Sequence, residues 1–452
     1  MLGLFRPPCP IDLREKVWTE LRMGWLVERF GWQQMRDAPV ILPTQEFFPV
    51  IRDGSHAEGE QTFERVCHYL EVQQDQVRLE IASDDAASDD TGGSIRDDVT
   101  TVRVPESLLT DQESLIAAMA RLVTLDRLWR SGNLTGQEID ASWLVELATV
   151  FFGMGVFGAN AAVQHRHATN GTWNWWAVRR QGHLPARVYG YAMALFAFSR
   201  REHRPAWART LGHDALDSFR RGGRYLKKAT DCVFDCEANG LTRSAKSDTA
   251  LESDLRHGSD SIRLAALWDI LDRGPAASQL TDAVKECLRM KNPILRTEAA
   301  RVIGAMGPSA SSAAPNVIRA FSSRNSDVRR QCVLAVEQLE LPQDMKGPHG
   351  ETVYDELLCL LEDPDPLVVR AVAHTLRRYG QEAQEAAEHM IRHLCRALVA
   401  CDYETSDFYF DVLEAITPDI ERFLDEHMKA THPDLYPLAV ETLEQSRAHR
   451  GQ

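Results

Sequence analysis

The chain has 452 residues, of which 44% are hydrophobic and 26% are charged, and its formal net charge is −15. This length exceeds what one hydrophobic core organises and predicts roughly two or three domains. The ordinary apolar content excludes a globally disordered chain, and the negative charge argues against general binding to nucleic-acid phosphates. We therefore expect a folded protein, and the negative charge favours basic proteins or peptides as its partners.

Cysteine usage favours a reducing compartment. The nine cysteines are scattered without paired spacing and lie mostly in apolar stretches, so they are interpreted as reduced core thiols. Cys232 and Cys236 could share a helical face as zinc ligands, but two ligands alone are weak support and burial is favoured. Residues 1–10 contain no apolar run long enough for a signal peptide, so a cytoplasmic protein is expected.

The first predicted elements are two helices and a strand. Apolar and aromatic residues recur at three and four positions over residues 11–32, which predicts an amphipathic helix. A second helix is expected at about 60–70, and alternation over 76–82 predicts a strand. Residues 83–98 carry six aspartates and two adjacent glycines. They predict a solvated loop, with a docking site for a basic partner as the alternative.

The next predicted elements are a strand and a capped helix. Residues 100–104 alternate again and are expected to pair with the first strand in a small antiparallel sheet. Residues 110–113 read Thr-Asp-Gln-Glu, a capping-box pattern that should begin a helix running to about residue 130.

Residues 143–163 are almost wholly apolar and long enough to span a bilayer. Glu146, several glycines and the absence of a flanking positive cluster favour a buried helix instead, with a membrane anchor as the alternative. A loop rich in histidine and tryptophan follows, and then an apolar helix near 187–199. These elements together predict one α+β domain over residues 1–236.

Residues 237–258 are polar, contain glycine and serine, and are predicted to form a linker. Beyond them an arginine recurs before each apolar helical face, at intervals of 33, 33 and 41 residues. In the clearest copy, Asn292 and Pro293 open a helix, and Gly304 and Gly307 close it. The four recurring arginines are Arg263, Arg296, Arg329 and Arg370.

This arrangement resembles HEAT repeats, particularly the short bacterial kind, over roughly residues 256–445. The resemblance implies an all-α solenoid over residues 259–452 with a degenerate C-terminal cap, and such folds hold other molecules more often than they catalyse reactions. We expect the recurring arginines to form a ladder between repeats with acids such as Asp260, Asp327 and Asp365. The concave faces are expected to carry specificity.

The order helix, strand, strand, capped helix over about residues 60–200 resembles the zinc metallopeptidases called gluzincins. In that family a helix carries HExxH and a later helix supplies a third, acidic zinc ligand. The matching positions here hold Arg121, Leu122, Leu125, Ser142 and Glu146. The resemblance therefore implies a zincin-like domain, mostly helical with a small antiparallel sheet, that has lost its metal, and an unrelated α+β domain is the alternative.

Two further groups of residues are candidates for binding. If the zincin-like frame is right, a buried pair of Arg121 and Glu146 could replace the zinc, although exposure of the arginine to water is the alternative. The loop near residue 170 could supply an aromatic binding face, although tryptophans more often anchor their own domain. The residues of that face are Trp173, Trp175, Trp176, Arg179 and Arg180.

The predicted function is a non-catalytic scaffold or adaptor that binds a protein partner through the solenoid. No cofactor, metal, nucleic acid or membrane is expected. The alternative is a metal-dependent hydrolase, because an H-x-H pair on a strand can bind metal on one face. Its site would use His165, His167, His183 and Glu146.

Overall fold

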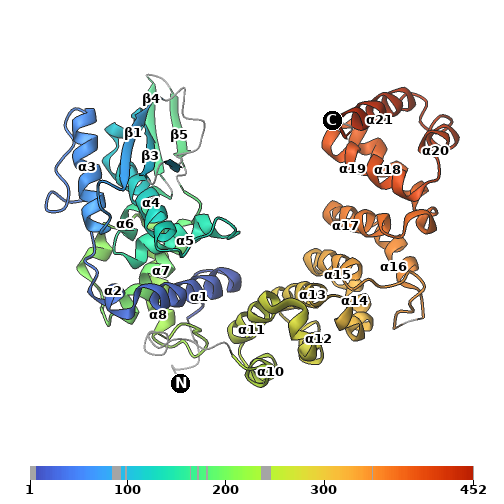
Figure 1. The fold of residues 1–452 in the computed structure, drawn as a ribbon, viewed down its shortest axis with the longest axis horizontal. Coiled ribbons are helices and arrows are strands. Elements are labelled where there is room, and N and C mark those ends of the chain that lie inside the picture. The colour runs from blue at the N-terminus through green and yellow to red at the C-terminus, as the bar shows by residue number, and fades with distance from the viewer. Residues whose placement is uncertain are drawn as a thin grey trace. The chain divides into compact units, whose positions relative to one another are not determined.

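The computed structural model describes residues 7–83, 93–96, 99–162, 164–170, 173–179, 182–235, 246–348 and 350–450. The chain divides into two compact units, residues 1–245 and 246–452, and both are mostly helical (Figure 1). The linker predicted at 237–258 contains helix α10 (Asp248–His257), whose N-terminus is capped by Ser247. That part of the prediction is wrong, because Leu251 and Leu255 of α10 are buried in the second unit.

The first unit begins with the predicted amphipathic helix, α1 (Leu13–Phe30). Asp12 accepts a hydrogen bond from the backbone N–H of Glu15, and the Glu15 side chain accepts one from the backbone of Asp12, which completes a capping box. Two more helices follow, α2 (Trp32–Asp37) and α3 (His56–Tyr69).

A three-stranded sheet follows, with strands β1 (Val77–Ala82), β2 (Gly93–Arg96) and β3 (Val99–Pro105) in the order β1-β3-β2. β3 runs parallel to β1 and antiparallel to β2. The predicted antiparallel pairing of the two longer strands is therefore wrong. The extra strand β2 arises within the predicted acidic loop and reverses the chain once more, so β3 returns in the direction of β1. Residues 84–92 of that loop lie outside the described residues.

Helix α4 (Gln112–Arg130) follows a short 3-10 helix, η1 (Glu106–Thr110). Its N-cap is Asp111, which accepts a hydrogen bond from the backbone N–H of Ser114. The helix therefore begins one residue later than predicted, and Asp111 rather than Thr110 caps it. The helix packs on β3 through a buried carboxylate. Asp126 accepts hydrogen bonds from the Thr100 hydroxyl at 2.5 Å and from Arg130 at 2.8 Å.

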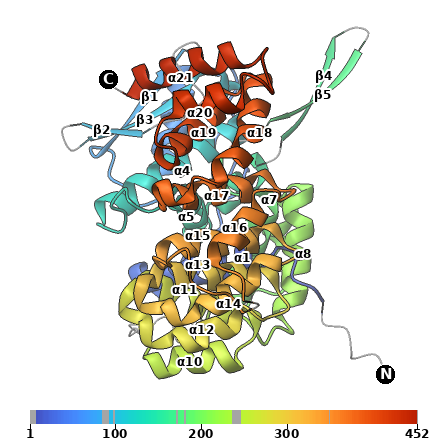
Figure 2. The same cartoon turned by 90° about the vertical axis from the view of Figure 1, so that its right-hand side faces the viewer.

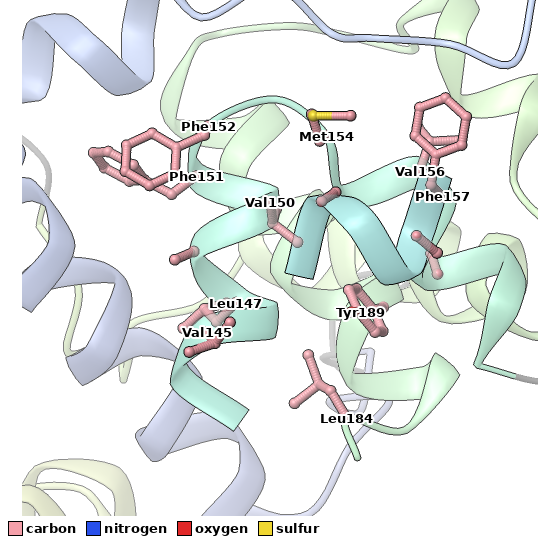
Figure 3. Close-up of a cluster of buried hydrophobic side chains, with 14 of the residues drawn as sticks. Val145, Leu147, Val150, Phe151, Phe152, Met154, Val156, Phe157, Leu184 and Tyr189 are labelled. Atoms are coloured by element: carbon pink, nitrogen blue, oxygen red, sulfur yellow. The ribbon is translucent and has the colours of Figure 1, made fainter. Parts of the chain in front are cut away.

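The long apolar segment forms two buried helices, α5 (Ala141–Phe151) and α6 (Gly155–Ala161). Gly153 separates them with φ of 85°, and a Cβ there would lie 2.0 Å from the carbonyl oxygen of Pro39. Glycine is therefore required at this turn. Figure 3 shows apolar side chains of α5 and α6 in the core of the unit, with Met154 on the turn that joins the two helices. Among the described residues, no helix is long and apolar enough to cross a membrane.

The segment predicted as a loop rich in histidine and tryptophan is instead an antiparallel hairpin of β4 (Gln164–Asn170) and β5 (Trp173–Arg179). It extends away from the helices of its unit (Figure 2). Helix α7 (Ala186–Ser199), the 3-10 helix η2 (Ala206–Thr210) and helix α8 (His213–Leu226) complete the unit. α7 and α8 approach closely at Gly190, where a Cβ would lie 2.3 Å from the Ala215 carbonyl oxygen.

The second unit is helical apart from one isolated β-bridge among its described residues, between Lys346 and Thr352. Its 3-10 helices are η3 (Gly274–Leu280), η4 (Gly307–Ala313), η5 (Ala320–Ser322) and η6 (Gly380–Ala383). Its other α-helices are α11 (Asp260–Arg273), α12 (Thr281–Cys287), α13 (Pro293–Met306), α14 (Ala314–Arg319), α15 (Ser326–Gln338), α16 (Val353–Leu360), α17 (Pro366–Arg377), α18 (Ala386–Val399), α19 (Tyr403–Ile416), α20 (Ile420–His427) and α21 (Tyr436–Arg450).

These helices form a row of pairs. The odd-numbered helices α11 to α21 each contact the next odd-numbered helix, and each also packs on the even-numbered helix before it. The pairs follow one another along the unit in Figure 1. The predicted start of α13 is confirmed, since Asn292 caps the helix and Pro293 is its first residue. Gly307 follows its end with φ of 67°, as predicted, but Gly304 lies inside the helix and does not close it.

Candidate functional site

Glu146 lies at the centre of the predicted zincin-like frame and is 1% exposed. Its Oε1 accepts a hydrogen bond from the backbone N–H of His183, and its Oε2 accepts one from the backbone N–H of Leu184, both at 2.8 Å. The Tyr189 hydroxyl donates to Oε2 at 3.2 Å. A Cβ on Gly182 would lie 2.7 Å from Oε1, so only glycine fits there.

The charge of Glu146 is therefore stabilised by donors from the loop that leads into α7. Burial, and then the charge of Glu146, raise the pKa of Tyr189, which keeps its hydroxyl protonated as a donor. The His183 ring is exposed, with Nδ1 3.6 Å from Oε1. Because each oxygen already accepts a backbone N–H, the carboxylate holds this loop against α5, and this is a structural role.

The other zincin-like positions divide into two groups. Arg121 is partly exposed and lines the same cavity of about 20 Å³ as Glu146 and Tyr189, a space the size of one water molecule. Leu122 and Leu125 pack in the core. Ser142 is exposed in the first turn of α5. The structure thus brings Arg121 and Glu146 to one cavity but not the other three residues, and a direct Arg121–Glu146 pair stays a prediction.

The hairpin supplies the other histidine and tryptophan candidates. The register pairs His165 with Val178, His167 with Trp176, and Ala168 with Trp175. Their side chains, and Arg180 entirely, lie outside what the structure describes, so the predicted aromatic face stays a prediction. Within the described residues, no group of three or more His, Cys, Asp or Glu side chains is arranged to hold a metal ion.

Three of the four recurring arginines of the second unit donate to backbone carbonyls near the end of the preceding helix. Arg263 donates to the carbonyl oxygens of Leu255 and Arg256 at the end of α10, at 2.9 and 3.0 Å. Arg329 donates to the Ser323 carbonyl at 2.8 Å, and Arg296 reaches the Met290 carbonyl at 3.5 Å. Each of these three arginines lies near the start of one helix of a pair and donates to carbonyls at or just after the end of the other helix. This role explains their regular position.

Only two of the arginines reach an acid in the next helix pair. Arg329 forms a bidentate pair with Asp363, at 2.6 and 2.7 Å, and Arg370 lies 3.5 Å from Glu404.

The three acids named for the predicted ladder, Asp260, Asp327 and Asp365, do not form these links between helix pairs, because the described structure gives them local partners. Asp260 lies 3.7 Å from Arg263 in its own helix, and Asp327 pairs with Arg330. Asp365 caps the N-terminus of α17.

A basic pocket of about 320 Å³ lies where α12 and α14 end and α13 and α15 begin. We call it the arginine pocket, and its cations are Arg289, Arg296, Arg319 and Arg324. Within the described residues 246–348, no acidic side chain lines it. The Nε of Arg296 is buried there and has no hydrogen-bond partner among the described residues. Leaving a buried donor without an acceptor costs free energy, and a ligand oxygen that reached this N–H would accept its hydrogen bond.

The first unit also contains a buried charged cluster that reasoning from apolar periodicity does not detect. Lys16 and Glu20 on α1 are 2% and 0% exposed, and the Lys16 ammonium lies 3.1 Å from Glu20. Glu20 also accepts hydrogen bonds from the Tyr191 hydroxyl at 2.5 Å and the Val233 backbone N–H at 2.7 Å. The spacing of opposite charges four apart on the inner face of a helix is the sequence signal for such a pair. Because this cluster is buried and has several hydrogen-bond partners, its role is structural.

Comparison with models of protein families finds no match, and comparison with curated proteins finds none either. The function must therefore be argued from the residues themselves.

Proposed function

We propose that the chain is a non-catalytic scaffold that binds a protein partner through a HEAT-like solenoid formed by the second unit. The row of helix pairs supports this proposal, because stacked pairs bury a continuous core and leave an extended surface for binding. The arginine pocket is the observation that carries it. Four cations without an acidic neighbour lie there, in a chain whose net charge is −15.

The chemistry of the pocket defines the partner class. Arg289, Arg319 and Arg324 are exposed, and Arg296 contributes an unsatisfied N–H from the pocket wall. Guanidinium groups bind carboxylates in bidentate geometry, so the partner should present an acidic segment at this edge. Like charges held together in the free protein favour binding of an opposite charge and raise the association rate.

The first unit is proposed to be an inactive zincin-like domain. The position of α4 after the sheet supports this assignment, as does the cavity shared by Arg121 and Glu146. Glu146 would then be retained because it holds the loop before α7.

Affinity purification of the tagged full chain from its native cells, with quantitative mass spectrometry, tests the proposal. The test variant carries Arg289→Glu, Arg319→Glu and Arg324→Glu. Its matched control carries Arg392→Glu, Arg422→Glu and Lys429→Glu, which reverse three exposed cations of the same unit outside the pocket. We expect a protein with an acidic segment to be recovered with the wild type and the control and lost with the test variant. Equal recovery with all three would refute the proposal.

A further inference from the structure

A groove with an apolar floor and a volume of about 700 Å³ lies in the first unit between α7, η2 and α8. Ala194, Ala197 and Phe198 of α7 face Leu216 and Phe219 of α8 across it. Phe198 is 41% exposed and is one of few large apolar side chains on the surface. The floor can therefore receive an apolar side chain from a ligand.

Five exposed cations line this groove, and none has an acidic or hydrogen-bonding partner among the described residues. They are Arg204, Arg209, Arg220, Arg224 and Lys227, and we call the site the cationic groove.

The two acids in the lining are already engaged. Glu202 pairs with Arg200 at 2.8 Å and accepts from the Trp207 indole at 2.9 Å, and Asp217 pairs with Arg221 at 3.5 Å. The groove is thus strongly positive in a chain of net charge −15.

The dimensions of the groove indicate the kind of ligand. Its lining runs along α8 from Leu216 to Lys227, which corresponds to about 16 Å of helix. An extended peptide of about five residues has that length. Cations spread along a groove over an apolar floor match alternating acidic and apolar side chains better than a single phosphate group.

The backbone at the rim of the groove supports a binding role for Arg204. This residue has φ of 57°, in the left-handed region that favours glycine, and it lies in the turn between α7 and η2. A bulky side chain there costs backbone strain. Its charge finds no partner within the described residues, so stability of the fold does not explain the arginine.

We propose that the cationic groove binds a short, extended, acidic segment of another protein, with one apolar side chain placed against Phe198. This site is separate from the arginine pocket, and it does not depend on the function proposed for the second unit. Nucleic acid is the less favoured ligand, because the rest of a strand would meet an overall negative surface.

Fluorescence anisotropy with the purified full chain tests this inference. The probe is a short labelled peptide in which aspartates flank one phenylalanine, and the comparison peptide carries asparagines instead. Arg220→Glu with Arg224→Glu is the test variant. Arg78→Glu with Lys228→Glu, which reverses two exposed cations of the same unit outside the groove lining, is the matched control. We expect salt-sensitive binding that weakens about tenfold or more in the test variant and much less in the control.

Arg204→Gly separates binding from folding. We expect this variant to melt at the same or a higher temperature, because glycine relieves the strain, and to bind the aspartate peptide about threefold or more weakly. No binding to the wild type, equal loss in both double variants, or unchanged binding by Arg204→Gly would overturn the inference. Tighter binding of labelled single-stranded DNA, lost in the test variant alone, would overturn it in favour of a nucleic-acid site.

Discussion

The Arg329–Asp363 pair offers the sharpest test of how the helix pairs of the second unit are held together. Arg329 lies near the start of α15, and Asp363 lies in the turn before α17. Their side chains are 12% and 3% exposed, and two hydrogen bonds of 2.6 and 2.7 Å join them. Asp363 also accepts from the backbone N–H of Asp365 at 2.9 Å. Asp363→Ala removes all of these contacts.

The expected loss of stability follows from the geometry of this ion pair. Truncating one partner of a buried ion pair costs about 3–5 kcal/mol, because the remaining charge stays buried. Arg329 retains some exposure and its bond to the Ser323 carbonyl, so we expect the lower end of that range. Asp363→Asn keeps an acceptor for the Asp365 N–H and should cost about half as much. Glu404→Ala is the control, because its pair with Arg370 is exposed, and it should cost less than about 0.5 kcal/mol.

Native-state hydrogen exchange measured by mass spectrometry is the assay. Peptides from α15 and α17 report the free energy of opening of this region separately from the first unit. We expect Asp363→Ala to lower that free energy far more than Glu404→Ala does. If both substitutions lower it by the same small amount, the buried pair does not stabilise the row of helices.

Three other predictions concern individual side chains. Glu146→Ala leaves two backbone N–H groups without their acceptor, so it should lower the free energy of unfolding by about 2–3 kcal/mol. Urea denaturation measures this loss. An unchanged urea midpoint would show that the loop does not need the carboxylate. Cys359 and Cys401 are exposed. In a Cys236→Ser variant, which removes the one cysteine outside the described residues, we expect two thiols to react fast with a disulfide reagent. Labelling of the buried cysteines at the same rate would contradict the described packing. Burial lowers the pKa of His393 from 6.5, so the unfolded chain binds this proton more readily. The second unit should then be most stable above pH 6.5 and lose stability as the pH falls below it, and His393→Gln should reduce that pH dependence in urea titrations.

The sequence predicted the helices well where apolar periodicity and caps agree. α1 and α13 begin and end close to the expected residues because Asp12 and Asn292 supply cap side chains that act locally. The strand direction in the first unit was not predictable in the same way. A short strand of glycine, serine and arginine in an acidic segment carries little alternation, yet it decides the direction of β3.

The candidate sites were predicted less well, because charged side chains find partners that are distant in the sequence. Two of the acids expected in the arginine ladder, Asp327 and Asp365, have local partners instead. Arg329 pairs with Asp363, a residue that the repeat pattern does not single out. The cationic groove was missed for the same reason, as Arg204 is separated from the α8 cations in sequence and joins them only through the packing of α7 on α8.

Metal content of the purified, untagged chain separates a binding protein from a hydrolase most directly. Zinc, iron and manganese should be quantified per chain in the wild type, in Glu146→Gln, which keeps an acceptor for the loop, and in His165→Ala. The scaffold function predicts no stoichiometric metal in any of the three proteins. One equivalent of zinc in the wild type, lost in either variant, would contradict it and identify the first unit as a metal-dependent hydrolase.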